Sequence, residues 1–204
     1  MDEARTRGIV VAMTGASGAA YGLRLMQRLG ALGARLHVLV SDAARLVLRE
    51  EAGLILPEEP GTAAETLTRH LRLEEGRIAC HALDDWFSPA ASGSAGIRRM
   101  AVAPCSMGTL ARIATGASDN LIERAADVML KEGGRLILMP RETPLSAIHL
   151  EHMLKLARLG ARIVPAMPGF YHRPESLDDI VDFMVDRLMM QLGLADGSEK
   201  RWGE

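Results

Sequence analysis

Short apolar runs recur along the chain, and each has the length of a β-strand. They cover residues 8–13, 35–40, 77–82, 100–104, 135–140 and 161–166. Most of these runs are continuously apolar and do not alternate with polar residues. Such runs are typical of strands that are buried on both faces of a parallel sheet. We expect Pro104 to end the fourth strand because proline cannot donate to a ladder.

Helical periodicity fills most of the intervals between these runs. The clearest case is residues 176–192, where apolar side chains recur every three or four positions and Ser176 with Asp179 resembles a capping box. Ser41 is placed to cap another helix. The remaining predicted helices cover residues 19–32, 63–71, 106 onward, 120–131 and 146–159. Strands that alternate with helices predict an α/β fold with a mostly parallel sheet and helices on both faces.

Composition narrows the class of protein. With 204 residues, 48% of them apolar and 25% charged, the chain is expected to form a single globular domain with residues 1–7 and 195–204 as peripheral tails. A net charge of −2 does not favour a nucleic-acid partner. No apolar stretch approaches the roughly 20 residues of a membrane span. Two cysteines are too few for a disulfide framework, so we expect a cytoplasmic protein.

Small and polar residues follow the predicted strands. In an open α/β sheet, ligands bind beyond the carboxyl ends of the strands, and these segments should therefore converge on one rim. The five rim segments are residues 14–18, Ser41, 105–109, 141–143 and 168–171.

The first rim loop, residues 14–18, has the sequence TGASG. Its small residues let the backbone approach an anion, and the following helix offers unpaired N–H groups. It is neither GxGxxG nor a Walker loop, so either a phosphate site or a plain tight turn explains it. Residues 105–109 repeat this pattern, with ordinary capping by Ser106 as the alternative. Cys105 is interpreted as a small buried residue and not as a nucleophile.

Taken together, five motifs resemble the flavin prenyltransferases of the UbiX type over nearly the whole chain. They are TGASGAAYG at 14–22, PCSMGT at 104–109, NLIERAAD at 120–127, PRETPL at 140–145 and PGFYHRP at 168–174. The resemblance implies a flavodoxin-like or Rossmann-like three-layer sandwich and a dodecamer with sites at subunit contacts. It also implies transfer of the dimethylallyl group of dimethylallyl phosphate to N5 and C6 of reduced FMN, without a metal. The product would serve a partner decarboxylase of the UbiD type.

The resemblance also assigns residues. Proton handling falls to Ser17, Glu51 and Glu142. The donor phosphate is assigned to Tyr171 and Arg187, with Lys131 and Arg141 adding charge. Arg124 joins this substrate set, and Trp86 is the aromatic side chain beside the substrate. The FMN contacts implied by the family are Gly15, Ala16, Ser17, Ser41, Ser106, Met107, Gly108, Thr109 and Arg141.

These assignments make chemical sense. A departing phosphate needs cationic and hydroxyl donors when no metal is present. We expect Glu142 to protonate the phosphate, which requires a raised pKa. Glu51 would take a proton from the flavin through Ser17, and the Trp86 ring would stabilise an allyl cation.

Several alternatives remain open. Arg124, Asp127 and Lys131 lie at helical spacing and suit an exposed ion-pair ladder. Residues 178–182 spell DDIVD, a magnesium motif in other prenyl enzymes, but acids at a helix start also favour its dipole. An FMN-dependent decarboxylase of the cysteine-decarboxylase type would share the fold, although its usual asparagine and catalytic histidine are not evident. A flavin carrier without catalytic activity is a further alternative.

Overall fold

The computed structural model describes residues 7–195 and residue 197. Most of the two predicted tails, including Trp202, lies outside these described residues.

The strands form one parallel sheet in the order β3-β2-β1-β4-β5-β6, which confirms the predicted sheet type. β6 is shorter than predicted, but Val164 and Ala166 still donate backbone hydrogen bonds to β5 residues. The strand bounds are Ile9–Met13 (β1), Leu36–Val40 (β2), Ile78–Cys80 (β3), Arg99–Cys105 (β4), Arg135–Pro140 (β5) and Arg162–Ile163 (β6).

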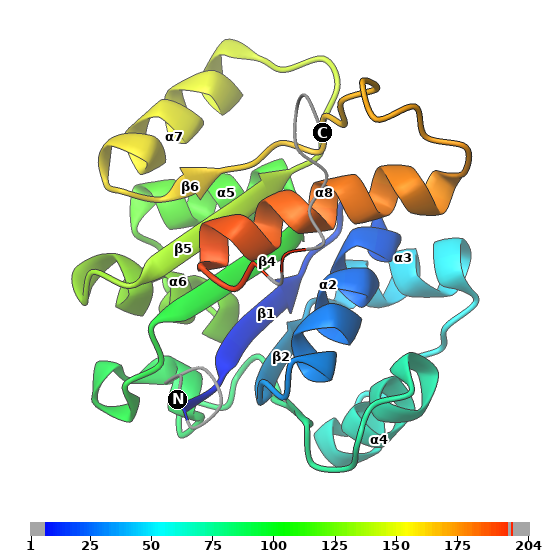
Figure 1. Ribbon diagram of the computed structural model, residues 1–204. Coiled ribbons are helices and arrows are strands. Elements are labelled where there is room, and N and C mark those ends of the chain that lie inside the picture. Colours follow the sequence, from blue (N-terminus) through cyan, green and yellow to red (C-terminus); the bar gives the residue numbers. More distant parts are fainter. Residues whose placement is uncertain (1–6, 196, 198–204) are drawn as a thin grey trace.

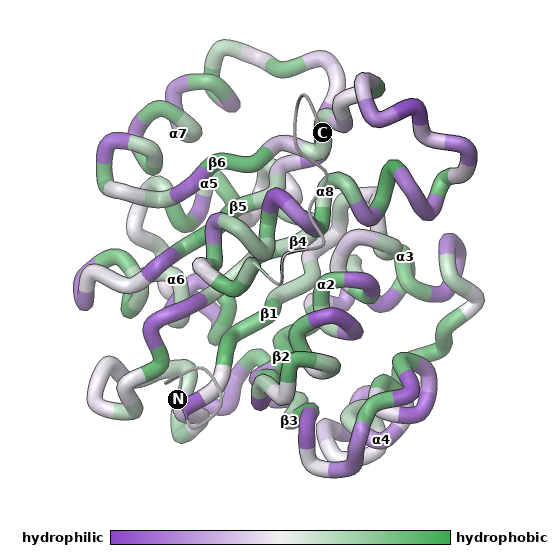
Figure 2. Tube along the Cα trace, in the orientation of Figure 1, coloured by the Kyte–Doolittle hydropathy of each residue, from purple (hydrophilic) through white to green (hydrophobic). Residues whose placement is uncertain are grey.

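Helices cover both faces of the sheet, which gives the three-layer sandwich that was expected (Figure 1). β1 shows why, because Ile9, Val11 and Met13 pack on one face and Val10 and Ala12 on the other. In Figure 2 the strands form an apolar centre, and polar positions lie along the outer helices. The first face carries α2 (Ala19–Ala31), α3 (Asp42–Ala52), α4 (Pro60–Leu71) and α8 (Leu177–Leu192). The second carries α5 (Met107–Thr115), α6 (Leu121–Lys131) and α7 (Ala147–Arg158).

The expected end of the fourth strand was wrong. β4 continues through Pro104 to Cys105, which pairs with Pro140 of β5 across a local register shift. Pro104 lacks an N–H group, but its carbonyl oxygen accepts from the backbone of Thr14, 3.1 Å away. The strand therefore keeps its neighbour on one side without needing a proline donor.

The acidic run at residues 178–182 is occupied by structural contacts. Arg24 of α2 pairs with Asp178 at 3.0 Å and with Asp182 at 3.2 Å. Asp179 completes the predicted capping box with Ser176. One turn further along α8, the largely buried Asp186 pairs with Arg28 of α2. These acids join α2 to α8 and cap α8.

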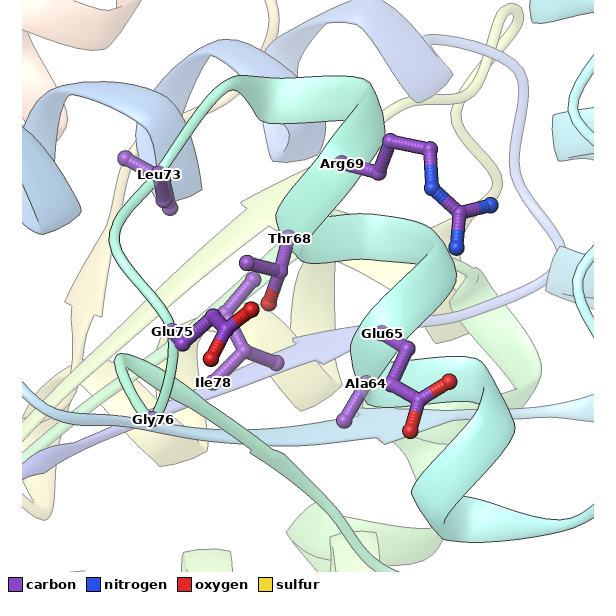
Figure 3. Close-up of a pocket in the computed structure, with 8 residues that line it drawn as sticks. All are labelled: Ala64, Glu65, Thr68, Arg69, Leu73, Glu75, Gly76 and Ile78. Carbon is purple, nitrogen blue, oxygen red and sulfur yellow. The ribbon is translucent and has the colours of Figure 1, made fainter.

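A hollow of about 530 Å³ lies between α4 and the segment that enters β3 (Figure 3). Its lining includes Glu65, Arg69 and Glu75. It sits at the start of the outermost strand, whereas the rim loops follow the strand ends, so it is not the site predicted from the sequence. Among the described residues, no helix is long and apolar enough to cross a membrane.

Candidate flavin site at the strand ends

Thr14 joins the loops that follow β1 and β4. Its hydroxyl donates to the carbonyl oxygen of Pro104 at 3.1 Å and accepts from the amide of Ser106 at 2.7 Å. Thr14 is buried, so these bonds are shielded from water. β1 and β4 are neighbours in the sheet, but the chain leaves them toward opposite sides, toward β2 and β5. Ligands of open α/β sheets bind at such a switch point.

Glu51 occupies the amino end of α2. One of its carboxylate oxygens accepts from the amides of Gly18 at 2.9 Å and Ala19 at 2.8 Å. Glu51 lies at the end of α3, so the contact also ties α3 to α2. Gly18 has φ 114°, a left-handed conformation that favours glycine, and offers no side-chain cap of its own. The anion at this helix end is therefore a side chain of the protein itself.

The environment of Glu51 favours its ionised form. Partial burial acts to raise the pKa of the Glu51 carboxyl. Hydrogen bonds from the Ser17 hydroxyl and from the Ala19 and Gly18 amides outweigh that effect, with help from the charge of Arg141. The net result is a pKa below the ordinary glutamate value. Glu51 thus interacts with the Ser17 hydroxyl and with the charge of Arg141, which come from two other segments of the chain.

The amino end of α3 lies against the first rim loop. Ser41 caps α3 as predicted, because its hydroxyl oxygen accepts from the amide of Ala44 at 3.2 Å. Gly15 must be small, since a Cβ there would lie 2.5 Å from the Cβ of Ala43. The two rim segments are therefore held in direct contact.

The loop after β4 ends in the cap of α5. The Ser106 hydroxyl accepts from the amide of Thr109 at 3.3 Å and lies 3.1 Å from the Thr109 hydroxyl. Gly108 has room above it, because a Cβ there would meet only the Arg112 guanidinium at 3.6 Å. Cys105 is fully buried, and burial raises the pKa of its thiol to about 12. The prediction of a buried cysteine is confirmed, and a thiolate nucleophile does not fit this position.

Behind this loop lies a buried carboxylate that sequence reasoning did not single out. Glu123 is 0% exposed and forms an ion pair with Arg112, which donates to the Thr109 hydroxyl at 3.4 Å. Glu123 also accepts from the Asp119 amide and from the side chain of Asn120, the cap of α6. The spacing of Asn120 and Glu123 is that of a capping box, a signal that could have identified the pair.

The loop after β5 begins with Arg141 and Glu142. The backbone of Arg141 donates to Cys105 at 3.4 Å, which keeps this loop beside the loop after β4. The Arg141 side chain is exposed. Glu142 is half-buried, and its carboxylate accepts from the amide of Thr143 at 3.0 Å.

Tyr171 and Arg187 meet directly. A guanidinium N–H of Arg187 donates to the Tyr171 hydroxyl oxygen at 2.6 Å, and the same guanidinium lies 4.9 Å from the centre of the Phe183 ring. Tyr171 packs edge-on against Phe183 at 5.6 Å. Gly169 allows this packing, because a Cβ there would lie 3.0 Å from the tyrosine ring.

Three other predicted substrate residues lie outside the five rim segments. Lys131 pairs with Glu132 at the end of α6, just before β5, and thus lies near the amino ends of the strands, opposite the rim. Arg124 pairs with Asp127 at 2.9 Å and donates to the carbonyl of Ala91, so the predicted ion-pair ladder exists only in part. Trp86 is half exposed in the segment after β3.

Comparison with known proteins decides the family. The chain matches the family described as Flavoprotein over residues 1–189. It is 51% identical to the flavin prenyltransferase UbiX of Pseudomonas aeruginosa over 96% of this chain and 94% of that protein. The corresponding enzyme of Halalkalibacterium halodurans is 49% identical over 95% of this chain and 92% of its own length.

The chain belongs to the UbiX family of flavin prenyltransferases.

Solved UbiX structures agree with this assignment. A dodecameric FMN-dependent UbiX-like decarboxylase from Escherichia coli O157:H7 superposes with a TM-score of 0.83 at 41% identity, over 96% of this chain and 99% of that one. AnUbiX in complex with FMN and dimethylallyl pyrophosphate gives a TM-score of 0.82 at 40% identity, covering 96% and 97%. The FMN-dependent cysteine decarboxylase TvaF is 15% identical with a TM-score of 0.57, covering 91% and 97%, which shows a shared fold alone.

The space above Gly108 provides a test of the UbiX flavin site. Gly108→Ala should stabilise the flavin-free protein by about 0.5–1 kcal/mol, because alanine favours a helix over glycine. The same methyl group should weaken FMN binding by about tenfold or more, which corresponds to about 1.4 kcal/mol. Thermal denaturation and flavin fluorescence titration measure the two effects. Gly61→Ala, at the same position of α4, is the matched control and should leave FMN affinity unchanged. Unchanged FMN affinity in Gly108→Ala would remove Gly108 from the site.

Proposed function

We propose that this protein joins the dimethylallyl group of dimethylallyl phosphate to N5 of reduced FMN and closes a ring at C6. At N5, the C–O bond to phosphate breaks and a C–N bond forms, so the phosphate needs stabilisation and N5 must lose its proton. At C6, the prenyl alkene takes a proton, the resulting cation bonds to C6, and C6 loses its proton. The observation that carries the proposal is the meeting of Ser17, Glu51 and Arg141 at the switch point of a UbiX-family chain. The prenylated flavin then serves a decarboxylase of the UbiD type.

FMN fits the rim with its phosphate at α5. The amides at the start of α2 already donate to Glu51. At the start of α5, the Ser106 hydroxyl accepts a hydrogen bond from the amide of Thr109. The Met107 and Gly108 amides, in the first turn, have no intrahelical acceptor and can donate to a phosphate. The isoalloxazine ring then lies between the loops after β1 and β4, beside Ser17.

Ser17 and Glu51 together suit removal of a flavin proton. Because the Ser17 hydroxyl donates to Glu51, its oxygen can accept a proton from the flavin while its own proton passes to the carboxylate. The lowered pKa keeps Glu51 ionised at neutral pH, ready to accept. The positive charge of Arg141, on the loop after β5, stabilises the ionised carboxylate of Glu51.

Tyr171 and Arg187 suit the donor phosphate. Their bond of 2.6 Å presents a guanidinium and a phenol as one unit, the donor chemistry that a phosphate group needs without a metal. The ring of Phe183 packs against both side chains and so limits their movement. Glu142, next to Arg141, supplies a proton to the departing phosphate in this scheme.

A homo-oligomer completes the proposed site. Lys131 lies near the amino ends of the strands of its own sheet, away from the rim, and therefore reaches a donor phosphate only in a neighbouring copy. α7 exposes Ile148, Leu150 and Leu154, large apolar side chains that a partner subunit would cover. The dodecameric E. coli protein, 41% identical, is in keeping with such an assembly.

The most direct functional test is anaerobic incubation of purified protein with reduced FMN and dimethylallyl phosphate. Mass spectrometry should show a flavin that carries one dimethylallyl unit. Dimethylallyl pyrophosphate should be tested in parallel, because AnUbiX was crystallised with it. Unmodified flavin with both donors, together with CO₂ release from an aromatic acid or a peptidyl cysteine by this protein alone, would contradict the proposal and favour a decarboxylase.

Arg187→Ala tests the phosphate clamp. Loss of a charge-assisted hydrogen bond of about 1.5–3 kcal/mol should raise the KM for the donor by roughly tenfold or more. FMN affinity should not change, because Arg187 is assigned to the donor alone. Arg69→Ala, which removes the same charge from α4, is the control and should have no effect. An unchanged donor KM in Arg187→Ala would contradict the clamp.

Glu142→Gln tests the proton donor. Removal of a general acid typically costs about 10²-fold or more in rate, so kcat should fall while the donor KM stays within about threefold. Steady-state kinetics measures this, with Glu65→Gln at an exposed position of α4 as the matched control. Full turnover in Glu142→Gln would assign the proton to another group.

A further inference from the structure

Two stacked histidines lie outside the proposed chemistry. His37 of β2 is 3% exposed, and the ring of His81, just after β3, stacks on it with centres 5.2 Å apart and planes at 25°. His37 Nδ1 lies 3.0 Å from His81 Nε2. A hydrogen bond therefore joins the two imidazoles, with one proton between them.

Hydrogen-bond acceptors flank this pair at both ends. His37 bonds to the backbone of Arg7, and its Nε2 edge faces the same segment, since a Cβ on Gly8 would lie 2.8 Å from that nitrogen. His81 Nδ1 lies 3.8 Å from a carboxylate oxygen of Asp85. Neither the Arg7 carbonyl nor an ionised Asp85 carboxylate can donate.

When both imidazoles are neutral, the pair has fewer N–H protons than contacts that need one. Three contacts each need one proton: His37 to Arg7, His37 to His81, and His81 to Asp85. Two neutral imidazoles carry only two N–H protons, so one contact has no hydrogen bond. The long His81–Asp85 separation of 3.8 Å identifies it as that contact. A third proton would fill it and create an imidazolium beside the Asp85 carboxylate.

Asp85 also holds the next residues in place. Its other carboxylate oxygen accepts from the amide of Phe87 at 3.1 Å, and its carbonyl accepts from Ser88 at 3.2 Å. The turn that these bonds hold carries two aromatic residues, Trp86 with 50% exposure and Phe87 with 101%. A shift of the Asp85 carboxylate toward His81 therefore pulls on the turn that carries Trp86.

Burial and the surrounding charges determine the pH at which the pair takes this third proton. Burial lowers the pKa of His81, Asp85 opposes this, and Arg35, in the segment before β2, adds to it. Burial, His81 and Arg35 lower the pKa of His37 to about 4, despite its bond to Arg7. The pair is thus neutral at pH 7. His81, which faces the carboxylate, takes the third proton as the pH falls below the ordinary histidine value of about 6.5.

We propose that Asp85 is a positioning residue for Trp86, and that protonation of His81 draws Asp85 inward and reorients Trp86. The link to catalysis rests on the proposed function, in which Trp86 lies beside the donor. The expected consequence is a donor KM that rises in mild acid while kcat at saturation changes little.

Tryptophan fluorescence tests the positioning directly. The chain has two tryptophans, so Trp202→Phe leaves Trp86 as the sole reporter. From pH 8 to pH 5, its emission in the flavin-free full-length protein should show one titration step with an apparent pKa below about 6.5. In Trp202→Phe/His81→Gln the step should vanish, because glutamine keeps a donor toward His37 but cannot charge. His70→Gln, an exposed histidine of α4, is the control and should retain the step.

The outcomes separate this inference from the proposed function. A step that persists in His81→Gln, or no step in the parent, would overturn the inference. If His81→Gln fails to fold, Asp85→Asn provides the same test, since it removes the carboxylate and leaves both histidines. With flavin and donor present, lowering the pH from 7 to 5.5 should raise the donor KM more in the parent than in His81→Gln, because protonation of the donor phosphate, with a pKa of about 6, affects both proteins equally. Failure to form any prenylated flavin, with the fluorescence step intact, would refute the function and leave the positioning of Trp86 standing.

Discussion

The hydrogen bonds of Thr14 are the constraint on which the site depends. Its hydroxyl donates to the Pro104 carbonyl and accepts from the Ser106 amide, so the loops after β1 and β4 cannot separate without exposing buried polar groups. A buried group that loses its partner costs about 1–3 kcal/mol, which holds this junction rigid. The rim segments on either side of Thr14 take their positions from this junction.

Glu51 determines where at the rim an anion can bind. By accepting from the first amides of α2, it uses the positive end of that helix for a side chain of the protein itself. A phosphate group bound at the same amides would face a carboxylate. In the proposed site the anions of the two substrates therefore lie elsewhere, with the FMN phosphate at α5 and the donor phosphate at Tyr171 and Arg187. The same carboxylate accepts a hydrogen bond from Ser17, its partner in the proposed removal of the flavin proton.

Sequence patterns were sufficient for contacts within one element or across one turn. They predicted the parallel sheet, the cap at Ser41, the capping box of α8 and the buried Cys105, and they offered capping by Ser106 as an alternative. They missed contacts set by tertiary packing. Glu51 reaches Gly18 across 33 residues, and Pro104 stays within β4 because Thr14 uses its carbonyl. The resemblance named Lys131, but only the topology shows that it lies near the amino ends of the strands, opposite the rim.

In the proposed site, two separate anion sites flank one flavin. A crystal structure of the protein with FMN and dimethylallyl phosphate would locate both phosphates. We expect the FMN phosphate at the start of α5, the donor phosphate on Tyr171 and Arg187, and Glu51 still bound to the Gly18 and Ala19 amides. A phosphate group on those two amides, with Glu51 displaced, would contradict it.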